Sequence, residues 1–162
     1  MKSVRRLLTT AVLLCAMPAL AQDDKPASSH VMVEGAEVKW KPASGALDKG
    51  AETAVLSGNP GMPGPFVMRI RMPAGYKIAP HWHPTDENVT VLSGTLSLGM
   101  GETFDTKATK PLAAGGFALL PAEMRHFAWT QDGATIQIHG MGPFKITYVN
   151  PADDPGKKTP SR

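Results

Sequence analysis

The segment from Gly75 to Gly94, GYKIAPHWHPTDENVTVLSG, carries the pattern that decides the fold. His81 and His83 are two residues apart. On a β-strand, residues with this spacing point to the same face, whereas Trp82 between them points to the other face. Two imidazoles on one face of a strand form a natural pair of metal ligands. The segment therefore predicts a strand that presents half of a metal site.

Two later side chains are candidates for the other half of this site. Glu87 follows a short turn and can supply a carboxylate from the next strand. His126 opens a further strand after the turn-like sequence PAEMR at 121–125. If that strand lies beside the first pair, three imidazoles and one carboxylate converge on one ion. Asp86 is an alternative carboxylate, but its position along the strand is out of phase with the histidines, so the pattern favours Glu87.

This donor set suits a borderline divalent cation, which means Zn, Fe, Mn, Ni or Cu, and disfavours Mg and Ca. An octahedral shell with four protein ligands leaves two neighbouring positions open for a small-molecule substrate or for dioxygen. A tetrahedral shell would be closed and structural only. The residues alone do not choose between the metals.

The remaining sequence is typical of short strands separated by turns. Short apolar runs alternate with Gly, Pro, Asn and Asp, and no long stripe with a 3.6-residue period appears, so an all-β sandwich or barrel is predicted. The expected strands cover residues 31–33, 37–41, 66–72, 88–93, 95–100, 117–120, 126–130, 135–139 and 144–149. Segments 88–93 and 95–100 flank Gly94 and are expected to form a hairpin. Segment 117–120 is expected to be buried, and 59–65 is expected to be a loop.

The central segment resembles the first sequence motif of the cupin superfamily. That motif consists of a glycine, five residues, a His-x-His pair, three or four residues, a glutamate, six residues and a second glycine. The chain matches every fixed position, with Gly75, His81, His83, Glu87 and Gly94. This match covers the two histidines and the carboxylate that the strand pattern selects.

A second stretch resembles the second cupin motif, with two departures. Gly115, Pro121 and His126 occupy matching positions. Glu123 stands where a turn glycine is usual, and Thr130 stands where asparagine is usual. A glycine there would tolerate a positive φ angle at little cost, so Glu123 puts the conformation of the turn in doubt. Neither departure removes an expected ligand.

The resemblance implies an all-β fold, the cupin double-stranded β-helix or jelly-roll barrel, with the metal inside the barrel near its mouth. It also implies a range of metal-dependent reactions on small molecules, including those of dioxygenases, isomerases and decarboxylases. The alternative is a non-catalytic cupin that binds a metal and a small molecule, and a third option is a dimer in which the metal is only structural. A homodimer through edge strands is consistent with the resemblance.

His139 is a candidate catalytic residue outside the metal set. It lies with Gln137 on one face of the sequence TIQIHG at 135–140, opposite Ile136 and Ile138. If that face lines the barrel, His139 could act as an acid or base beside the metal. In the other interpretation, which the pattern favours, the isoleucines fill the core and His139 faces water.

The N-terminus is typical of a secretory signal peptide over residues 1–21. A basic start precedes an uncharged apolar run at 7–16, and the small-x-small sequence at 19–21 marks a cleavage site. The apolar run is too short for a membrane anchor. We expect a flexible lead-in at 22–30, a cupin domain at 31–150, a flexible tail at 151–162, and a periplasmic or secreted protein.

Removal of this segment changes the charge and the thiol content. Three of the 17 basic residues lie in it, which leaves 14 basic against 14 acidic residues, so nothing in the mature chain indicates nucleic-acid binding. Cys15, the only cysteine, also lies in it. The mature chain is therefore expected to have neither a disulfide nor a thiolate metal ligand.

Overall fold

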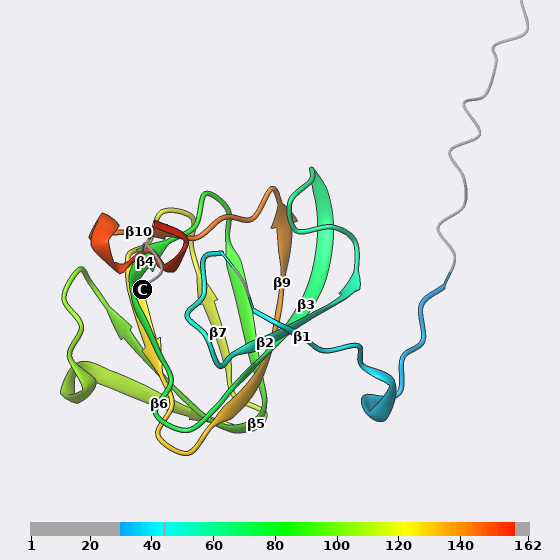
Figure 1. The fold of residues 1–162 in the computed structure, drawn as a ribbon, viewed down its shortest axis with the longest axis horizontal. Coiled ribbons are helices and arrows are strands. Elements are labelled where there is room, and N and C mark those ends of the chain that lie inside the picture. The colour runs from blue at the N-terminus through cyan, green and yellow to red at the C-terminus, as the bar shows by residue number, and fades with distance from the viewer. Residues whose placement is uncertain (1–29, 44, 158–162) are drawn as a thin grey trace, which may run out of the picture. The chain divides into compact units, whose positions relative to one another are not determined.

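The short strands and turns of the chain fold into one curled antiparallel sheet (Figure 1). A computed structural model describes residues 30–43 and 45–157. The expected signal peptide at 1–21, residues 22–29 of the lead-in and residues 158–162 of the tail lie outside the described residues. The strands are β1 Lys41–Pro42, β2 Glu52–Ser57, β3 Gly64–Met72, β4 Lys77–Trp82, β5 Glu87–Met100, β6 Thr109–Ala113, β7 Phe117–Leu120, β8 His126–Trp129, β9 Ala134–Gly142 and β10 Thr147–Tyr148.

The sheet consists of two parts that share β5. One part has the order β1-β2-β3-β9-β5, with β7 on the far side of β5. The other has the order β5-β8-β4-β10, with β6 also paired to β5. The described residues also form four short 3-10 helices, η1 Gly35–Glu37, η2 Thr106–Ala108, η3 Pro151–Asp153 and η4 Pro155–Lys157. The all-β fold class predicted from the sequence is confirmed.

β5 corrects the expected hairpin at Gly94. It is one strand whose first half pairs with β9 as far as Gly94, and whose second half pairs with β6 from Thr95 onward. Gly94 has a φ of +72°, and a Cβ there would lie 2.1 Å from the carbonyl oxygen of Gly133. The glycine thus permits a bend and a close backbone approach inside a strand, which a sequence pattern does not distinguish from a turn.

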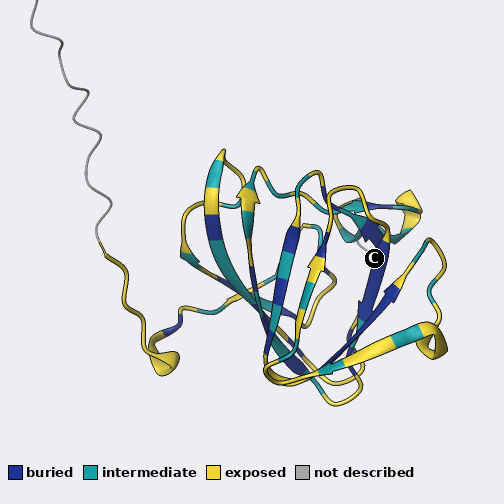
Figure 2. Ribbon diagram, turned by 180° about the vertical axis from the view of Figure 1, so that it is seen from behind, coloured by how far each residue is buried: buried dark blue, intermediate teal, exposed yellow. Residues whose placement is uncertain are grey.

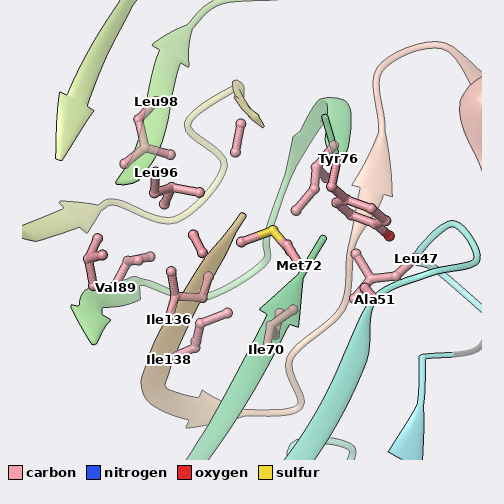
Figure 3. Packing of buried hydrophobic residues seen from close by; sticks show 14 of the residues in the cluster. Leu47, Ala51, Ile70, Met72, Tyr76, Val89, Leu96, Leu98, Ile136 and Ile138 are labelled. Atoms are coloured by element: carbon pink, nitrogen blue, oxygen red, sulfur yellow. The ribbon is translucent and has the colours of Figure 1, made fainter. Parts of the chain in front are cut away.

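Buried and less buried residues alternate over much of β3. Phe66, Ile70 and Met72 are buried, while Arg71 on the other face is exposed. Similar apolar residues from the other strands of both parts meet them inside the curled sheet (Figure 3). β6 contributes little to this core and is mostly exposed (yellow and teal in Figure 2). The core therefore lies inside the barrel, and its polar groups gather where β4, β5 and β8 begin or end.

Several strand predictions were wrong or only partly right. Residues 31–33 form no strand and are exposed, and only Lys41 of the predicted strand 37–41 is in β1. β7 exists as predicted, but Phe117 and Leu119 are exposed and only Leu120 is buried, because β7 is an edge strand paired with β5 alone. The predicted strand 144–149 is reduced to β10. Two residues of the predicted loop 59–65 belong to β3.

The C-terminal segment contains two short 3-10 helices. In the part of the expected flexible tail that the structure describes, residues 151–157 form η3 and η4. Asn150 caps η3 by accepting a hydrogen bond from the Ala152 N–H at 3.1 Å. Within the part of the chain that the structure describes, no helix is both long and apolar enough to span a membrane.

Candidate metal centre

Strand pairing brings three histidines together. His81 lies near the end of β4, and His83 follows two residues later. His126 is the first residue of β8 and pairs directly with His81 across the two strands. The ligand nitrogens of the three side chains lie within 4.8 Å of one another, and all three residues are buried. Two histidines that are close in sequence and a third that is distant thus lie together inside the barrel and can hold a metal ion.

Glu87 joins this cluster as the first residue of β5. Its Oε2 lies 3.4 Å from His83 Nε2 and 3.3 Å from His126 Nε2, and the residue is 5% exposed. Asp86, the alternative carboxylate, is exposed and points elsewhere. Its Oδ1 accepts a hydrogen bond from the Ala122 N–H at 2.8 Å. The parity argument therefore selected the carboxylate that lies beside the histidines.

Backbone carbonyl groups set the tautomer of each histidine. A carbonyl oxygen can only accept a hydrogen bond, so the ring nitrogen that faces it must carry the proton, and the other nitrogen keeps its lone pair. In each ring the protonated atom is Nδ1. The three pairs are His81 with the Ala79 oxygen at 2.7 Å, His83 with the Lys145 oxygen at 3.0 Å, and His126 with the Met124 oxygen at 2.9 Å. All three Nε2 atoms are thus left as electron-pair donors, as metal-binding histidines require.

The charges of the site match these tautomers. Burial lowers the pKa of His81 to about 3, helped by the neighbouring His126 and His83. Burial opposes ionisation of Glu87, but the favourable interaction of the carboxylate with the neighbouring His126 and His83 side chains outweighs it and holds the pKa of the carboxyl below its usual range. At neutral pH His81 is therefore neutral and Glu87 is ionised, which are the states that bind a metal.

One buried atom lacks a partner that a metal ion would supply. His83 Nε2 is inaccessible to solvent and makes no hydrogen bond with any residue that the structure describes. Its neighbour Glu87 Oε2, at 3.4 Å, is too distant for a good hydrogen bond. Buried polar atoms without partners are rare and require an explanation. A cation bound between these two residues satisfies both, so the donor set fits a metal ion.

The cluster opens into a cavity of about 570 Å³ inside the barrel. Most of the residues that line it are apolar, and the three histidines and Glu87 form one group of polar side chains in its wall. Phe144 also lines the cavity and stacks on His83, with ring centroids 4.2 Å apart and planes 16° from parallel. The arrangement combines a candidate metal centre with room for an organic ligand beside it.

Residues 28–144 match the sequence model of the ChrR Cupin-like domain family. The chain belongs to this cupin family. The cupin resemblance predicted from the two motifs is thereby confirmed. No curated protein sequence matches the chain.

Solved structures with the cupin fold resemble the described domain. The polyketide cyclase RemF from Streptomyces resistomycificus superposes with a TM-score of 0.66 at 17% identity, covering 79% of this chain and 91% of RemF. A putative acetylacetone dioxygenase from Methylibium petroleiphilum PM1 gives 0.59 at 22% identity, with 78% and 85% covered. An RmlC-like cupin from Shewanella frigidimarina NCIMB 400 gives 0.56 at 18%, with 70% and 91% covered. At these identities the likeness concerns the fold.

The two departures from the second cupin motif have distinct structural outcomes. Glu123 adopts a φ of +63°, so it keeps the left-handed turn that a glycine would form. Its N–H donates to the His83 carbonyl at 2.8 Å, which ties the turn before His126 to the strand of the first motif. Thr130 is fully buried, and its Oγ1 has no hydrogen-bond partner. Neither change displaces a histidine of this cupin.

His139 lies away from the cavity. It is exposed on β9, while its neighbour Ile138 is buried and lines the cavity. Gln137 shares the outer face and accepts a hydrogen bond from Arg69 Nε at 3.1 Å. The structure therefore places this candidate catalytic residue on the solvent side, as the favoured interpretation of the pattern expected, and not with the metal cluster.

Sequence reasoning missed the support of His83 from residues 144–145. Phe144 supplies the stacked ring and Lys145 supplies the carbonyl group that accepts from Nδ1. The segment was predicted as a strand, and strand parity says nothing about a ring that packs on a residue about 60 positions earlier. No local signal marks a backbone carbonyl as a partner of a distant side chain.

Proposed function

We propose that this cupin holds one divalent transition-metal ion on His81, His83, His126 and Glu87 and uses it to bind a small molecule in the adjoining cavity. One observation carries the proposal. The three Nδ1 atoms are all fixed by backbone carbonyl groups, so three Nε2 lone pairs are available beside an ionised carboxylate. The function that this arrangement supports best is that of a metal-dependent enzyme of dioxygenase, isomerase or decarboxylase type.

A bound divalent ion would polarise a substrate oxygen or provide a site for dioxygen. The protein residues set the conditions for that chemistry. Neutral histidines and one carboxylate leave a divalent ion with a net positive charge, which favours an anionic oxygen ligand such as an enolate or a carboxylate. The carbonyl partners keep the imidazoles from rotating, and the aliphatic wall keeps bulk water from the reacting atoms.

Metal analysis tests the proposal. We expect about one transition-metal ion per chain in protein purified from its native compartment and dialysed without chelator. His81→Ala is expected to lose the ion, whereas His139→Ala is a matched control that removes an exposed histidine and retains it. Equal metal content in the His81→Ala variant and the unmodified protein would contradict the proposed site.

Non-catalytic binding at the same metal is the second candidate function, and one observation favours it. Apart from Glu87, the charged residues that line the cavity are Lys145, Asp154 and Lys157, and both lysines are exposed. The described interior thus offers no separate general acid or base. Incubation of the metal-loaded protein in air with enolisable diketones and carboxylic acids separates the two functions. Product formation supports the enzyme, whereas ligand-dependent spectral change without product supports the binder.

We also propose that the protein acts outside the cytoplasm. The support is the order of basic start, apolar run and small-x-small sequence in residues 1–21. Mass spectrometry of the protein from a periplasmic fraction is expected to show a chain that begins at Gln22. A full-length chain found only in the cytoplasmic fraction would contradict export.

A further inference from the structure

The polarity of the cavity wall specifies its ligand. On one side, Met68, Ile138 and Val89 lie side by side across β3, β9 and β5. On the other side, Ile78, Ala128 and Leu98 lie side by side across β4, β8 and β5. All six residues line the cavity (Figure 3 labels Val89, Leu98 and Ile138). Two apolar rows from the two parts of the sheet thus enclose the space next to the metal cluster.

The charged and histidine side chains among the described lining residues form two sets. One set consists of the three histidines and Glu87, where every histidine Nδ1 already donates a hydrogen bond to a backbone carbonyl group. The other consists of Lys145, Asp154 and Lys157; Lys157 pairs with Asp154 at 3.5 Å and has a side chain that is 68% exposed. Among the other described lining residues, Thr53 is the only one whose uncharged side chain carries a hydroxyl or amide group.

This distribution excludes two common ligand classes. A sugar or another polyhydroxylated compound would lose hydrogen bonds to water for each hydroxyl group that enters an aliphatic wall without partners. A ligand with several negative charges would need buried cations, and both lysines at the cavity are exposed. An apolar body gains about 0.8 kcal/mol for each methylene transferred from water into such a wall.

We propose that the ligand of this site is a molecule with a single metal-binding oxygen head, such as an enolate, phenolate or carboxylate, on an otherwise apolar body. The inference rests on the proposed metal site and deepens it by naming the class of substrate. The head binds at the metal beside Glu87, and the body lies between the two apolar rows past Ala128, two residues along β8 from His126. The cavity volume of about 570 Å³ fits a body of small-molecule size.

A series of straight-chain hydroxamic acids from acetohydroxamic to octanohydroxamic acid tests this class. The metal-binding head is constant in the series, and only the apolar body grows. Binding to the cobalt(II)-loaded protein is read from the visible absorption of cobalt. We expect the Kd to fall about fourfold for each added methylene until the cavity is full, which corresponds to the same ~0.8 kcal/mol. Gluconohydroxamic acid, with a polyhydroxylated body, is expected to bind no better than acetohydroxamic acid.

A pair of variants locates the effect. Ala128→Leu adds three carbons inside the cavity and is expected to weaken the longest hydroxamates at least tenfold while leaving acetohydroxamic acid nearly unchanged. Ala113→Leu makes the same change at an exposed position on β6 and is expected to alter the binding of neither the longest hydroxamates nor acetohydroxamic acid. If Ala128→Leu does not fold, the chain-length series on the unmodified protein still decides.

The outcomes separate this inference from the proposed function. If cobalt binds but the Kd does not depend on chain length, or gluconohydroxamic acid binds as tightly as the long hydroxamates, the apolar ligand class is wrong and the metal site stands. Failure to take up cobalt, nickel or zinc would remove the metal site and this inference with it.

Discussion

The two ends of the barrel cavity are built by different means. At the metal end, backbone carbonyl groups hold the three imidazoles, one turn N–H holds the His83 backbone, and each contact has a defined donor and acceptor. At the apolar end, the wall is made of aliphatic side chains that only have to face inward. Hydrogen bonds are directional, whereas hydrophobic burial depends on area. The metal end is therefore sensitive to orientation, and the apolar end is sensitive to volume.

The largest expected effect is at the metal end. Glu87→Gln removes the only carboxylate of the cluster while keeping its size. We expect the affinity for zinc or nickel to fall by more than about 100-fold, since even the partners of metal ligands typically account for ~10–100-fold. Competition with a chromophoric chelator measures this. The matched control is Asp86→Asn at the exposed neighbour, which is expected to change metal affinity little. Equal affinities for Glu87→Gln and the unmodified protein would remove Glu87 from the site.

A truncation at the apolar end is expected to change stability and leave metal affinity intact. Leu96 is 1% exposed and lines the cavity. Leu96→Ala is expected to lower the free energy of unfolding by about 2–5 kcal/mol, because it removes buried methyl groups and enlarges a space that cannot collapse. Denaturant unfolding of the metal-free protein measures the free energy of unfolding, and chelator competition measures the metal affinity. A large loss of metal affinity would show that the two ends are not independent.

Phe144 lies between the two ends and sharpens the comparison. It stacks on His83 and lines the cavity. Phe144→Leu keeps an apolar side chain but removes the stacked ring, an interaction of about 0.5–1.5 kcal/mol. We therefore expect metal affinity to fall by roughly twofold to tenfold. No change in affinity, measured by the same competition assay, would mean that the Lys145 carbonyl group alone orients the imidazole.

The smallest expected effect concerns the turn at Glu123. Its φ of +63° is costly for a side chain with a Cβ. Glu123→Gly is expected to raise the free energy of unfolding by about 1 kcal/mol, with its backbone hydrogen bond to His83 retained and metal affinity unchanged. Urea unfolding curves of the two proteins give the difference. A less stable glycine variant would show that the Glu123 side chain makes a contribution larger than the backbone strain.

The sequence predicted the metal end better than the rest of the chain. The spacing of His81 and His83 follows from strand geometry, and parity was enough to choose Glu87 over Asp86. The position of His126 required the cupin resemblance or an assumption about which strands pair. The structure places His81, His83 and Glu87 together, as the fixed two-residue period of a strand led us to expect.

The wrong predictions concern features that local patterns do not determine. Gly94 is compatible with both a hairpin and a bent strand, and only the pairing of β5 with β9 and β6 separates them. Phe117 and Leu119 look like core residues, but β7 is an edge strand that leaves them exposed. In each case the outcome depends on residues far away in sequence.

The passage of β5 from one part of the sheet to the other has a consequence for how the protein opens and folds. β5 pairs with β9, β7, β6 and β8. We therefore expect its hydrogen-bonded amide protons to exchange with solvent only when most of the barrel comes apart. All four partners follow β5 in the chain. As the chain emerges from N- to C-terminus, β5 appears before all of these partners, and its hydrogen-bonding edges stay unpaired until they follow.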